Sequence, residues 1–206
     1  MCKIRVLIAD DHSIVRMGLA TLLELEDDLE LVGMSVNGKT AVAEAAKTKP
    51  DIVVMDLMMP VMDGIEATKA IKEKLPDTKI VLFTTFPTSD LISQALANGA
   101  TGAIFKSAAD TELIKAIRAV TAGKTYISSD IRKLLDSDPP VGALSPRQTE
   151  ILESIVRGLS NAEIGAQLGI TPTVVREHTI RLFQKIGAAN RAEAVAIALR
   201  KHLLKM

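Results

Sequence analysis

The sequence predicts an α/β domain, built on a five-stranded doubly wound parallel sheet of the flavodoxin-like type, followed by a smaller all-α domain. Over the first ~120 residues, short apolar runs alternate with amphipathic stretches five times, which is typical of a parallel α/β sheet. This alternation stops after Gly123, and every pattern from Leu144 onward is helical. A length of 206 residues suggests one or two domains of ~100–150 residues each.

The predicted strands are runs rich in Val, Ile and Leu, as expected for strands buried on both faces. They cover residues 4–9, 29–34, 51–55, 79–84 and 102–105. Apolar residues at helical spacing predict helices at 13–25, 38–48, 64–74, 89–98 and 110–122. Right-handed crossovers and the strand order 2-1-3-4-5 then place the binding crevice at the carboxyl ends of the first and third strands.

The second half begins with a polar, proline-containing stretch, residues 124–142, which we expect to be a linker with one short helix at 131–135. Helix-start signals follow at Ser145-Pro146, Ser160 with Glu163, Thr171-Pro172 and Asn190. The helices expected at 160–168 and 171–185 have helix-turn-helix proportions, and a last helix is expected at about 190–204. The predicted domains are therefore 1–123 and 143–206, joined by the linker 124–142.

Composition narrows the class of protein. Hydrophobic residues make up 48% of the chain and aromatic residues only 2%, so aliphatic packing must form the cores. The single cysteine, at position 2, excludes an internal disulfide, and no apolar stretch reaches the ~18 residues of a membrane helix. We therefore expect a cytoplasmic protein. Residues 143–206 carry nine lysines and arginines against five acidic residues, a balance that favours nucleic acid as a partner of this half.

Polar residues follow four of the predicted strands: Asp10 with Asp11, Asp56, Thr84 and Lys106. Carboxyl ends of parallel strands meet at one edge of a sheet, so these groups are expected to share a site. Neighbouring carboxylates disfavour each other's ionisation, because their negative charges repel. A divalent cation together with a phosphoryl group would relieve this repulsion. We interpret Asp56 as a nucleophile for a phosphoryl group, and Asp11 with Asp56 as Mg²⁺ ligands that Asp10 assists directly or through water. Lys106 and Thr84 would bind the phosphoryl oxygens.

Several motifs resemble known families. The segments Ile8–His12, Met55–Gly64 and Gly99–Lys106 resemble the receiver domain of bacterial two-component response regulators. The segments Leu144–Leu152, Gly158–Gly165, Val174–His178 and Asn190–Ala194 resemble the LuxR-type DNA-binding domain. Together they resemble the NarL/FixJ class over nearly the whole chain.

This resemblance implies a transcription regulator rather than an enzyme. A histidine kinase or a small acyl phosphate would phosphorylate Asp56, while Asp10, Asp11, Asp56 and the backbone carbonyl of Met58 would hold Mg²⁺. The helix at 171–185 would enter the major groove of DNA. Its expected contacts are Arg176, Glu177, His178, Ile180, Arg181 and Lys185. A two-fold homodimer, promoted by phosphorylation and contacting through the last helix, would read an inverted repeat.

Other functions stay open at this point. Members of the family that this chain resembles usually place an aromatic or similar switch residue where this chain has Ala103. Phe86, Phe105 or packing alone would then have to relay the phosphorylation signal. Otherwise the chain is a phosphorylation-independent transcription factor. An aspartate-dependent phosphatase is disfavoured because it needs a second acid where Met58 stands. A flavin-binding electron carrier is disfavoured because Asp10 and Asp11 would repel its phosphate and the chain has no tryptophan.

Overall fold

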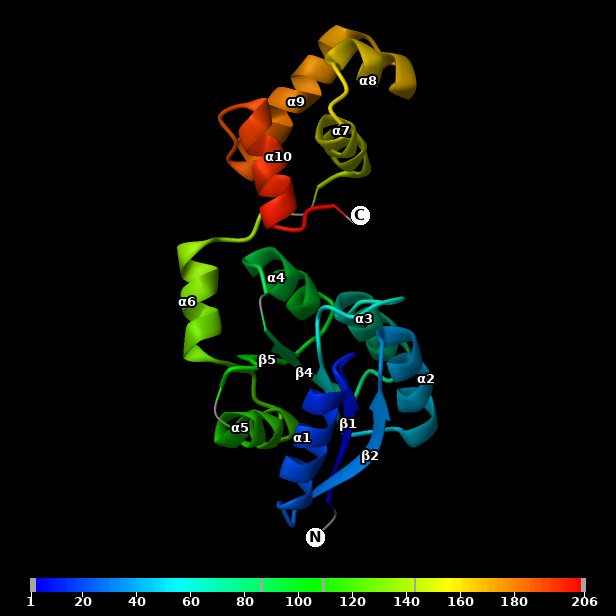
Figure 1. The fold of residues 1–206 in the computed structure, drawn as a ribbon, viewed down its shortest axis with the longest axis vertical. Coiled ribbons are helices and arrows are strands. Elements are labelled where there is room, and N and C mark those ends of the chain that lie inside the picture. The colour runs from blue at the N-terminus through cyan, green and yellow to red at the C-terminus, as the bar shows by residue number, and fades with distance from the viewer. Residues whose placement is uncertain (1–2, 86, 109, 143, 205–206) are drawn as a thin grey trace. The chain divides into compact units, whose positions relative to one another are not determined.

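The computed structural model describes residues 3–85, 87–108, 110–142 and 144–204, which form two compact units, Met1–Asp138 and Pro139–Met206. A six-stranded sheet in the order β2-β1-β3-β4-β5-β6 lies at the centre of the first unit (Figure 1). Its strands are β1 (Ile4–Ala9), β2 (Leu29–Ser35), β3 (Ile52–Met55), β4 (Lys79–Thr84), β5 (Gly102–Phe105) and β6 (Tyr126–Ile127). All neighbouring strands are parallel. The predicted order is confirmed, whereas the predicted number of strands was wrong by one.

Helices cover both faces of this sheet, as Figure 1 shows. They are α1 (Ser13–Glu24), α2 (Gly38–Thr48), α3 (Gly64–Lys74), α4 (Ser89–Ala97) and α5 (Asp110–Thr121). One buried cluster joins α1 and α5 to the sheet through residues such as Leu23 and Ile117. The other joins α2, α3 and α4 to the opposite face through residues such as Ala41, Ile71 and Ile92. This two-sided covering explains why the strands are continuous apolar runs.

The segment expected as a linker, residues 124–142, contains two further elements of the first unit. The two residues of β6 extend the sheet beside β5, and Ser128 N–H donates to the Ala103 carbonyl at 3.0 Å. The helix α6 (Ser129–Ser137) follows, with Ser128 as its N-cap. Ile131 of α6 is fully buried in the same cluster as Ala103. Burial of this apolar side chain stabilises α6 on the first unit, so the compact unit extends to Asp138.

The second unit is all helical, as expected. Its helices are α7 (Pro146–Val156), α8 (Asn161–Leu168), α9 (Pro172–Ile186) and α10 (Arg191–Arg200). The predicted caps Ser145, Ser160, Thr171 and Asn190 each accept a hydrogen bond from the first turn of their helix. Helix α10 ends four residues before the expected position 204, and His202 just beyond it has a left-handed backbone with φ of 50°.

A tight turn joins α8 to α9 and fixes the angle of the helix pair. Gly169 ends α8 in the left-handed region at φ of 66°, which glycine adopts without strain. A Cβ on Gly165 would lie 2.7 Å from the Ile170 carbonyl oxygen, so only glycine fits at this crossing. The unit's core is aliphatic, with Leu152, Val175 and Leu182 fully buried.

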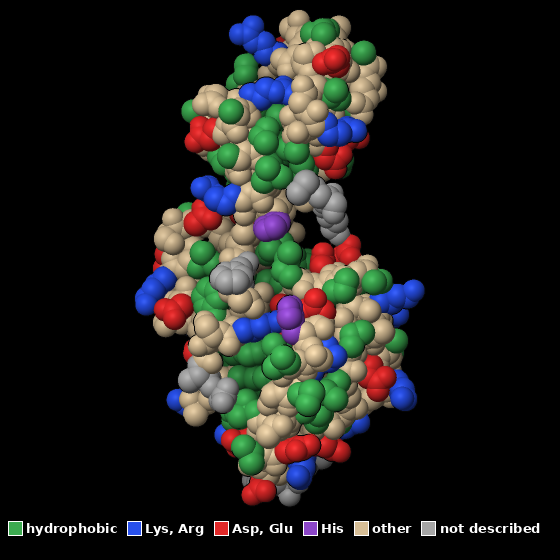
Figure 2. Space-filling view, viewed as in Figure 1, with side chains coloured by type: hydrophobic (Ala, Val, Ile, Leu, Met, Phe, Trp, Pro, Cys, Tyr) green, Lys and Arg blue, Asp and Glu red, His purple; other side chains and the backbone are tan. Residues whose placement is uncertain are grey.

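The surface of the chain mixes charged and apolar side chains (Figure 2). The most exposed large apolar residues of the first unit include Ile14, Met17, Leu25 and Val61. No helix in the described part of the chain combines the length and the apolar character that a membrane crossing needs.

Candidate functional site

Three groups that lie far apart in the sequence meet at the carboxyl edge of the sheet. Asp10 follows β1, Asp56 follows β3 and Lys106 follows β5. The Lys106 Nζ atom lies 2.6 Å from Asp10 Oδ2 and 2.7 Å from Asp56 Oδ2. The three side chains are only 9%, 2% and 4% exposed for Lys106, Asp10 and Asp56. The site is therefore a buried ammonium shared by two buried carboxylates.

Burial controls the ionisation of this group of side chains. Burial raises the pKa of the Asp56 carboxyl above its ordinary value, and the charge of Asp10 acts in the same direction. The hydrogen bond and charge of Lys106 oppose this rise without cancelling it. For Lys106 itself, burial acts to lower the pKa, but the hydrogen bonds and negative charges of Asp10 and Asp56 together outweigh burial, so its pKa is raised and the ammonium stays charged.

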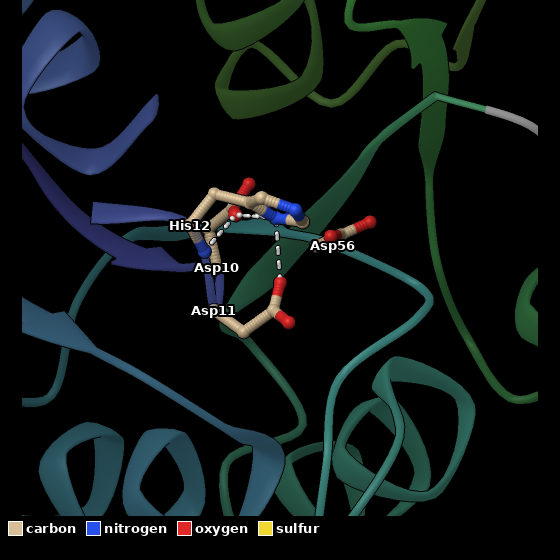
Figure 3. Close-up of side chains that lie close together, drawn as sticks. All are labelled: Asp10, Asp11, His12 and Asp56. Atoms are coloured by element: carbon tan, nitrogen blue, oxygen red, sulfur yellow. Dashed lines mark hydrogen bonds and ion pairs between the residues drawn. The ribbon is translucent and has the colours of Figure 1, made fainter. Parts of the chain in front are cut away.

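A third carboxylate and an imidazole complete the cluster (Figure 3). Asp11 and His12 follow Asp10 directly, and the His12 Nδ1 atom lies 2.7 Å from Asp11 Oδ1. One ligand atom from each of Asp10, Asp11, His12 and Asp56 lies within 4.8 Å of the others. Lys106 neutralises one of the three carboxylates, so a divalent cation matches the charge that remains. The donor atoms therefore fit a metal ion of that charge.

The loop between β3 and α3 is held by close backbone contacts. Gly64 N–H donates to the Leu57 carbonyl at 2.9 Å, and a Cβ on Gly64 would lie 2.1 Å from the Asp56 carbonyl oxygen. Asp63 caps α3 by accepting from Glu66 N–H. Only glycine allows α3 to begin against the backbone of Asp56, which explains the Asp-Gly pair in the sequence and fixes the position of Asp56.

Thr84 and Met58 also lie at this edge. Thr84 is buried at the end of β4, and its carbonyl accepts from Lys106 N–H at 2.8 Å. Met58 is half exposed, and its N–H lies 3.5 Å from Asp56 Oδ1, at the long limit of a hydrogen bond. The roles expected for the Thr84 hydroxyl and the Met58 carbonyl stay predictions.

The residues considered for relaying the phosphorylation signal differ in their surroundings. Ala103 is fully buried, and Phe105 is partly exposed and packs against the same cluster. Phe86 lies outside the described residues. Sequence reasoning missed two further groups, His12 and Arg16, whose Nη1 atom donates to the Asp10 carbonyl at 2.7 Å. The adjacency of His12 to two aspartates was the available signal.

The predicted DNA-reading residues all lie on α9. Arg176, Glu177, Ile180, Arg181 and Lys185 are exposed, and His178 is half-buried. Val175, Leu182 and Ile186 face the opposite way, into the core. This spacing gives the helix one buried face and one exposed polar face. Lys185 is less free than the arginines, because its Nζ atom lies 3.4 Å from Gln148 Oε1.

Several cations of the second unit have structural partners. Arg147 donates to the Leu168 carbonyl at 3.2 Å, and Arg191 donates to the Leu159 and Ile155 carbonyls. Lys201 is buried and donates to the Pro139 carbonyl at 2.9 Å. The net positive charge of this unit therefore overstates the charge that a nucleic acid could contact. The arginines of α9 are better candidates for such contacts.

A separate hollow lies at the opposite, amino edge of the sheet. It measures about 540 Å³ and is lined by residues that include Ile4, Pro50, Thr78 and Lys79. None of the predicted site residues lines it, so the chemistry expected at Asp56 does not use this hollow.

Comparison with known proteins matches both halves of the chain. Residues 6–118 match the response regulator receiver domain, and residues 142–198 match the bacterial regulatory proteins of the luxR family. The transcriptional regulatory protein LiaR of Bacillus subtilis (strain 168) is 38% identical over 98% of this chain and 99% of its own length. The oxygen regulatory protein NreC of Staphylococcus carnosus (strain TM300) is 36% identical over 97% of this chain and 99% of its own length.

Solved structures agree with these matches. RcsB from Salmonella enterica serovar Typhimurium, solved bound to promoter P1flhDC with the phosphomimetic BeF3⁻, superposes with a TM-score of 0.73. It is 26% identical, and the match covers 96% of this chain and 98% of that one.

Proposed function

Because this chain belongs to the two-component response regulators that join a receiver domain to a LuxR-type DNA-binding domain, and acts as a transcription factor, we propose that Asp56 is its phosphoryl acceptor. The observation that carries this assignment is the shared position of Lys106, 2.7 Å from Asp56 and 2.6 Å from Asp10. A compact ammonium beside a buried carboxylate is suited to receive the oxygens of a group transferred to that carboxylate.

The proposed chemistry is a single phosphoryl transfer. An Asp56 carboxylate oxygen attacks the phosphorus of a phosphohistidine on a sensor kinase, or of a small acyl phosphate. The P–N or P–O bond of the donor breaks with its electron pair leaving on the donor, and an acyl phosphate forms on Asp56. Lys106 then leaves its pairing with Asp56 to bind a phosphoryl oxygen, and the Thr84 hydroxyl donates to another.

Asp10, Asp11 and Asp56, with the Met58 carbonyl, would hold Mg²⁺. When bound, the ion supplies positive charge to the carboxylates and to the transferring phosphoryl group. Burial raises the pKa of Asp56 and so favours the neutral form of its carboxyl. Positive charge next to the carboxylate favours its ionised, attacking form.

Phosphorylation with acetyl phosphate tests this proposal. In the presence of Mg²⁺, intact-protein mass spectrometry should find one added phosphate on the wild type and none on Asp56→Asn. Asp77→Asn is a matched control, because Asp77 is an exposed carboxylate at the other edge of the sheet, beside the hollow. Asp11→Ala should also block labelling by weakening the metal site. Equal labelling of wild type and Asp56→Asn would disprove the assignment.

The exposed face of α9 is the proposed DNA reader, with Arg176, Glu177, His178, Ile180, Arg181 and Lys185 in the major groove. If Arg176 contacts a phosphate, Arg176→Ala should reduce the salt slope of binding by about one unit for all sequences. If it contacts guanine, the loss should be ~1–3 kcal/mol at one base position. Arg157→Ala is the control, because Arg157 is an exposed cation at the C-cap of α7. Unchanged affinity for Arg176→Ala would remove Arg176 from the interface.

A phosphorylation-dependent homodimer is the proposed active form on DNA. One helix the length of α9 reads only a few base pairs, whereas two copies related by a two-fold axis would read half-sites about one helical turn, ~10 bp, apart. A coupling of ~1–3 kcal/mol would raise affinity roughly 5–150-fold. Sedimentation with and without beryllofluoride should show a shift from monomer to dimer. A monomer in both states, on and off DNA, would rule this out.

One observation favours a second candidate, a transcription factor that does not respond to phosphorylation. Ala103 is small and fully buried at the position where the family resemblance leads us to expect an aromatic or similar switch residue. DNA binding of wild type and Asp56→Asn, each with beryllofluoride, separates the two candidates. A phosphorylation switch predicts enhanced binding by the wild type alone, and a constitutive factor predicts the same binding by both.

A further inference from the structure

The carboxylate cluster contains a nitrogen ligand that a magnesium site does not need. His12 extends its ring over Asp10 and Asp11 towards Asp56 (Figure 3). Its Nδ1 atom lies 2.7 Å from Asp11 Oδ1 and 3.3 Å from Asp10 Oδ1. Since ligand atoms of all four side chains lie within 4.8 Å of one another, the available donor set is three carboxylate oxygens and one imidazole nitrogen.

The backbone fixes the position of this ring. His12 N–H donates to Asp10 Oδ1 at 2.9 Å, and the His12 carbonyl accepts from Arg16 N–H at 3.1 Å at the start of α1. His12 occupies the N-cap position of α1, yet its side chain makes no capping hydrogen bond. With 66% of its side chain exposed, the ring also contributes little to the core. Neither capping nor core packing holds the ring, so its contacts with Asp10 and Asp11 keep it beside the carboxylates.

Metal ions differ in how they use such a donor set. Mg²⁺ prefers carboxylate oxygen and water, and gains little from imidazole. Imidazole is a favoured ligand for first-row transition metals such as Co²⁺, Ni²⁺ and Zn²⁺. A nitrogen donor next to three carboxylates should therefore change which metal the site prefers, even where the charge and size of the ions are similar.

We propose that His12 is a ligand for divalent transition metal ions at the phosphoryl site, and that it makes this site selective for them over Mg²⁺. The inference rests on the metal site of the proposed function and extends it. The same carboxylates serve both kinds of ion, whereas His12 serves only the transition metal. Occupancy of the site then depends on the ratio of the two kinds of metal around the protein.

The competing role for His12 is that of a hydrogen-bond partner that orients Asp11 without touching the metal. Loss of such a partner changes the affinity for every metal in the same direction, because it acts through a carboxylate that binds them all. A direct ligand affects only ions that accept nitrogen. The ratio of two affinities therefore distinguishes the roles, and a single affinity does not.

Isothermal titration calorimetry of the full chain with Co²⁺ and with Mg²⁺ provides this ratio. His12→Ala should weaken Co²⁺ binding by at least about tenfold and leave Mg²⁺ binding nearly unchanged. His12→Asn keeps a polar partner for Asp11 but removes the imidazole, and should behave like His12→Ala. The visible absorption bands of bound Co²⁺ should shift in both variants. His178→Ala, which removes an imidazole from α9, controls for adventitious histidine binding.

Equal losses for Co²⁺ and Mg²⁺, or no loss for either, would overturn the role of His12. Asp11→Ala should weaken both metals and so identify the site. If Mg²⁺ binds and Asp56 is labelled by acetyl phosphate, but His12→Ala leaves the ratio unchanged, only this inference fails. If neither metal binds the wild type, the metal site of the proposed function fails as well.

Discussion

Replacement of Lys106 by methionine should destabilise the receiver unit strongly, because it leaves two buried carboxylates without their cation. Methionine keeps much of the length and apolar volume of lysine, so the change mainly removes charge. Asp10 and Asp56 are 2% and 4% exposed and both depend on the same Nζ atom. Removal of one partner from a buried ion pair typically costs about 3–5 kcal/mol. That is a large fraction of the ~5–15 kcal/mol by which domains are stable.

The loss should depend on pH in a defined direction. The folded-state pKa of Asp56 is already above its ordinary value of 3.8, so its charged form destabilises the folded state as pH rises from 3.8 through that pKa. Without Lys106 the opposing hydrogen bond and charge disappear, and the folded-state pKa rises further. The difference in unfolding free energy between wild type and Lys106→Met should therefore be larger at pH 7.5 than at pH 5.

Urea unfolding followed by far-ultraviolet circular dichroism, with EDTA present, measures this effect. The control is Lys47→Met, because Lys47 is 77% exposed and its pairing with Glu44 at 3.7 Å should contribute less than about 1 kcal/mol. Mg²⁺ should restore part of the stability of Lys106→Met by supplying the missing positive charge. The reasoning is refuted if Lys106→Met costs no more than the control, or if its cost is the same at both pH values.

Three further changes test other parts of the first unit. Gly64→Ala should lower the free energy of unfolding by about 3 kcal/mol, because the added Cβ would lie 2.1 Å from the Asp56 carbonyl oxygen. It should also weaken Mg²⁺ binding measured by calorimetry, and unaltered binding would contradict this reasoning. Ile131→Ala should cost about 2–5 kcal/mol in urea unfolding, since Ile131 is fully buried, and a negligible loss would mean that α6 is not part of the unit. Arg118→Ala should cost about 1 kcal/mol, because Arg118 pairs with Glu26 and Asp28 at the surface at 2.6 Å. The Arg118 hydrogen bond lowers the pKa of Asp28, so this last loss should be full above pH 3.8 and disappear as pH falls through the folded-state pKa; a loss that persists in acid would refute it.

The parallel sheet could be predicted because its evidence is local. Each of the first five strands contains four consecutive residues that are apolar or glycine, and the helices between the strands show regular spacing. The sixth strand, Tyr126–Ile127, has only two residues, too few to show a period of two. Its pairing depends on an open edge at β5, which the sequence near Tyr126 does not reveal.

The candidate site was predictable for a different reason. Asp10, Asp56 and Lys106 each end a buried strand, and parallel topology alone brings those ends to one edge. Topology does not determine where side chains point once a loop has begun. The position of His12 results from a turn in which its N–H binds Asp10 Oδ1, and such a hydrogen bond is visible only in the folded chain. Sequence reasoning therefore found the carboxylates and the lysine and missed the imidazole.

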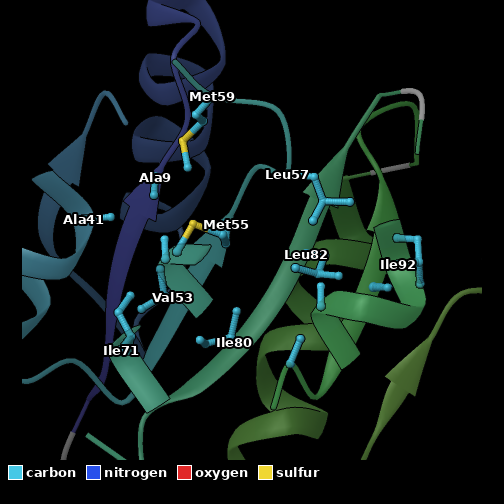
Figure 4. Close-up of a cluster of buried hydrophobic side chains, with 14 of the residues drawn as sticks. Ala9, Ala41, Val53, Met55, Leu57, Met59, Ile71, Ile80, Leu82 and Ile92 are labelled. Atoms are coloured by element: carbon cyan, nitrogen blue, oxygen red, sulfur yellow. The ribbon is translucent and has the colours of Figure 1, made fainter. Parts of the chain in front are cut away.

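Ala103 and a buried residue of the segment predicted as a linker lie in the same buried cluster. Ala103 and Ile131 are both fully buried there, together with Val53, Leu82 and Ile92, part of the cluster shown in Figure 4. Protein cores are close-packed, so a small residue on β5 must be matched by apolar volume from elsewhere. Ile131 on α6 supplies such volume, while Ser128 N–H binds the Ala103 carbonyl. The small residue at position 103 and the packing of α6 against the sheet therefore depend on each other. The sequence of either segment alone does not predict this arrangement.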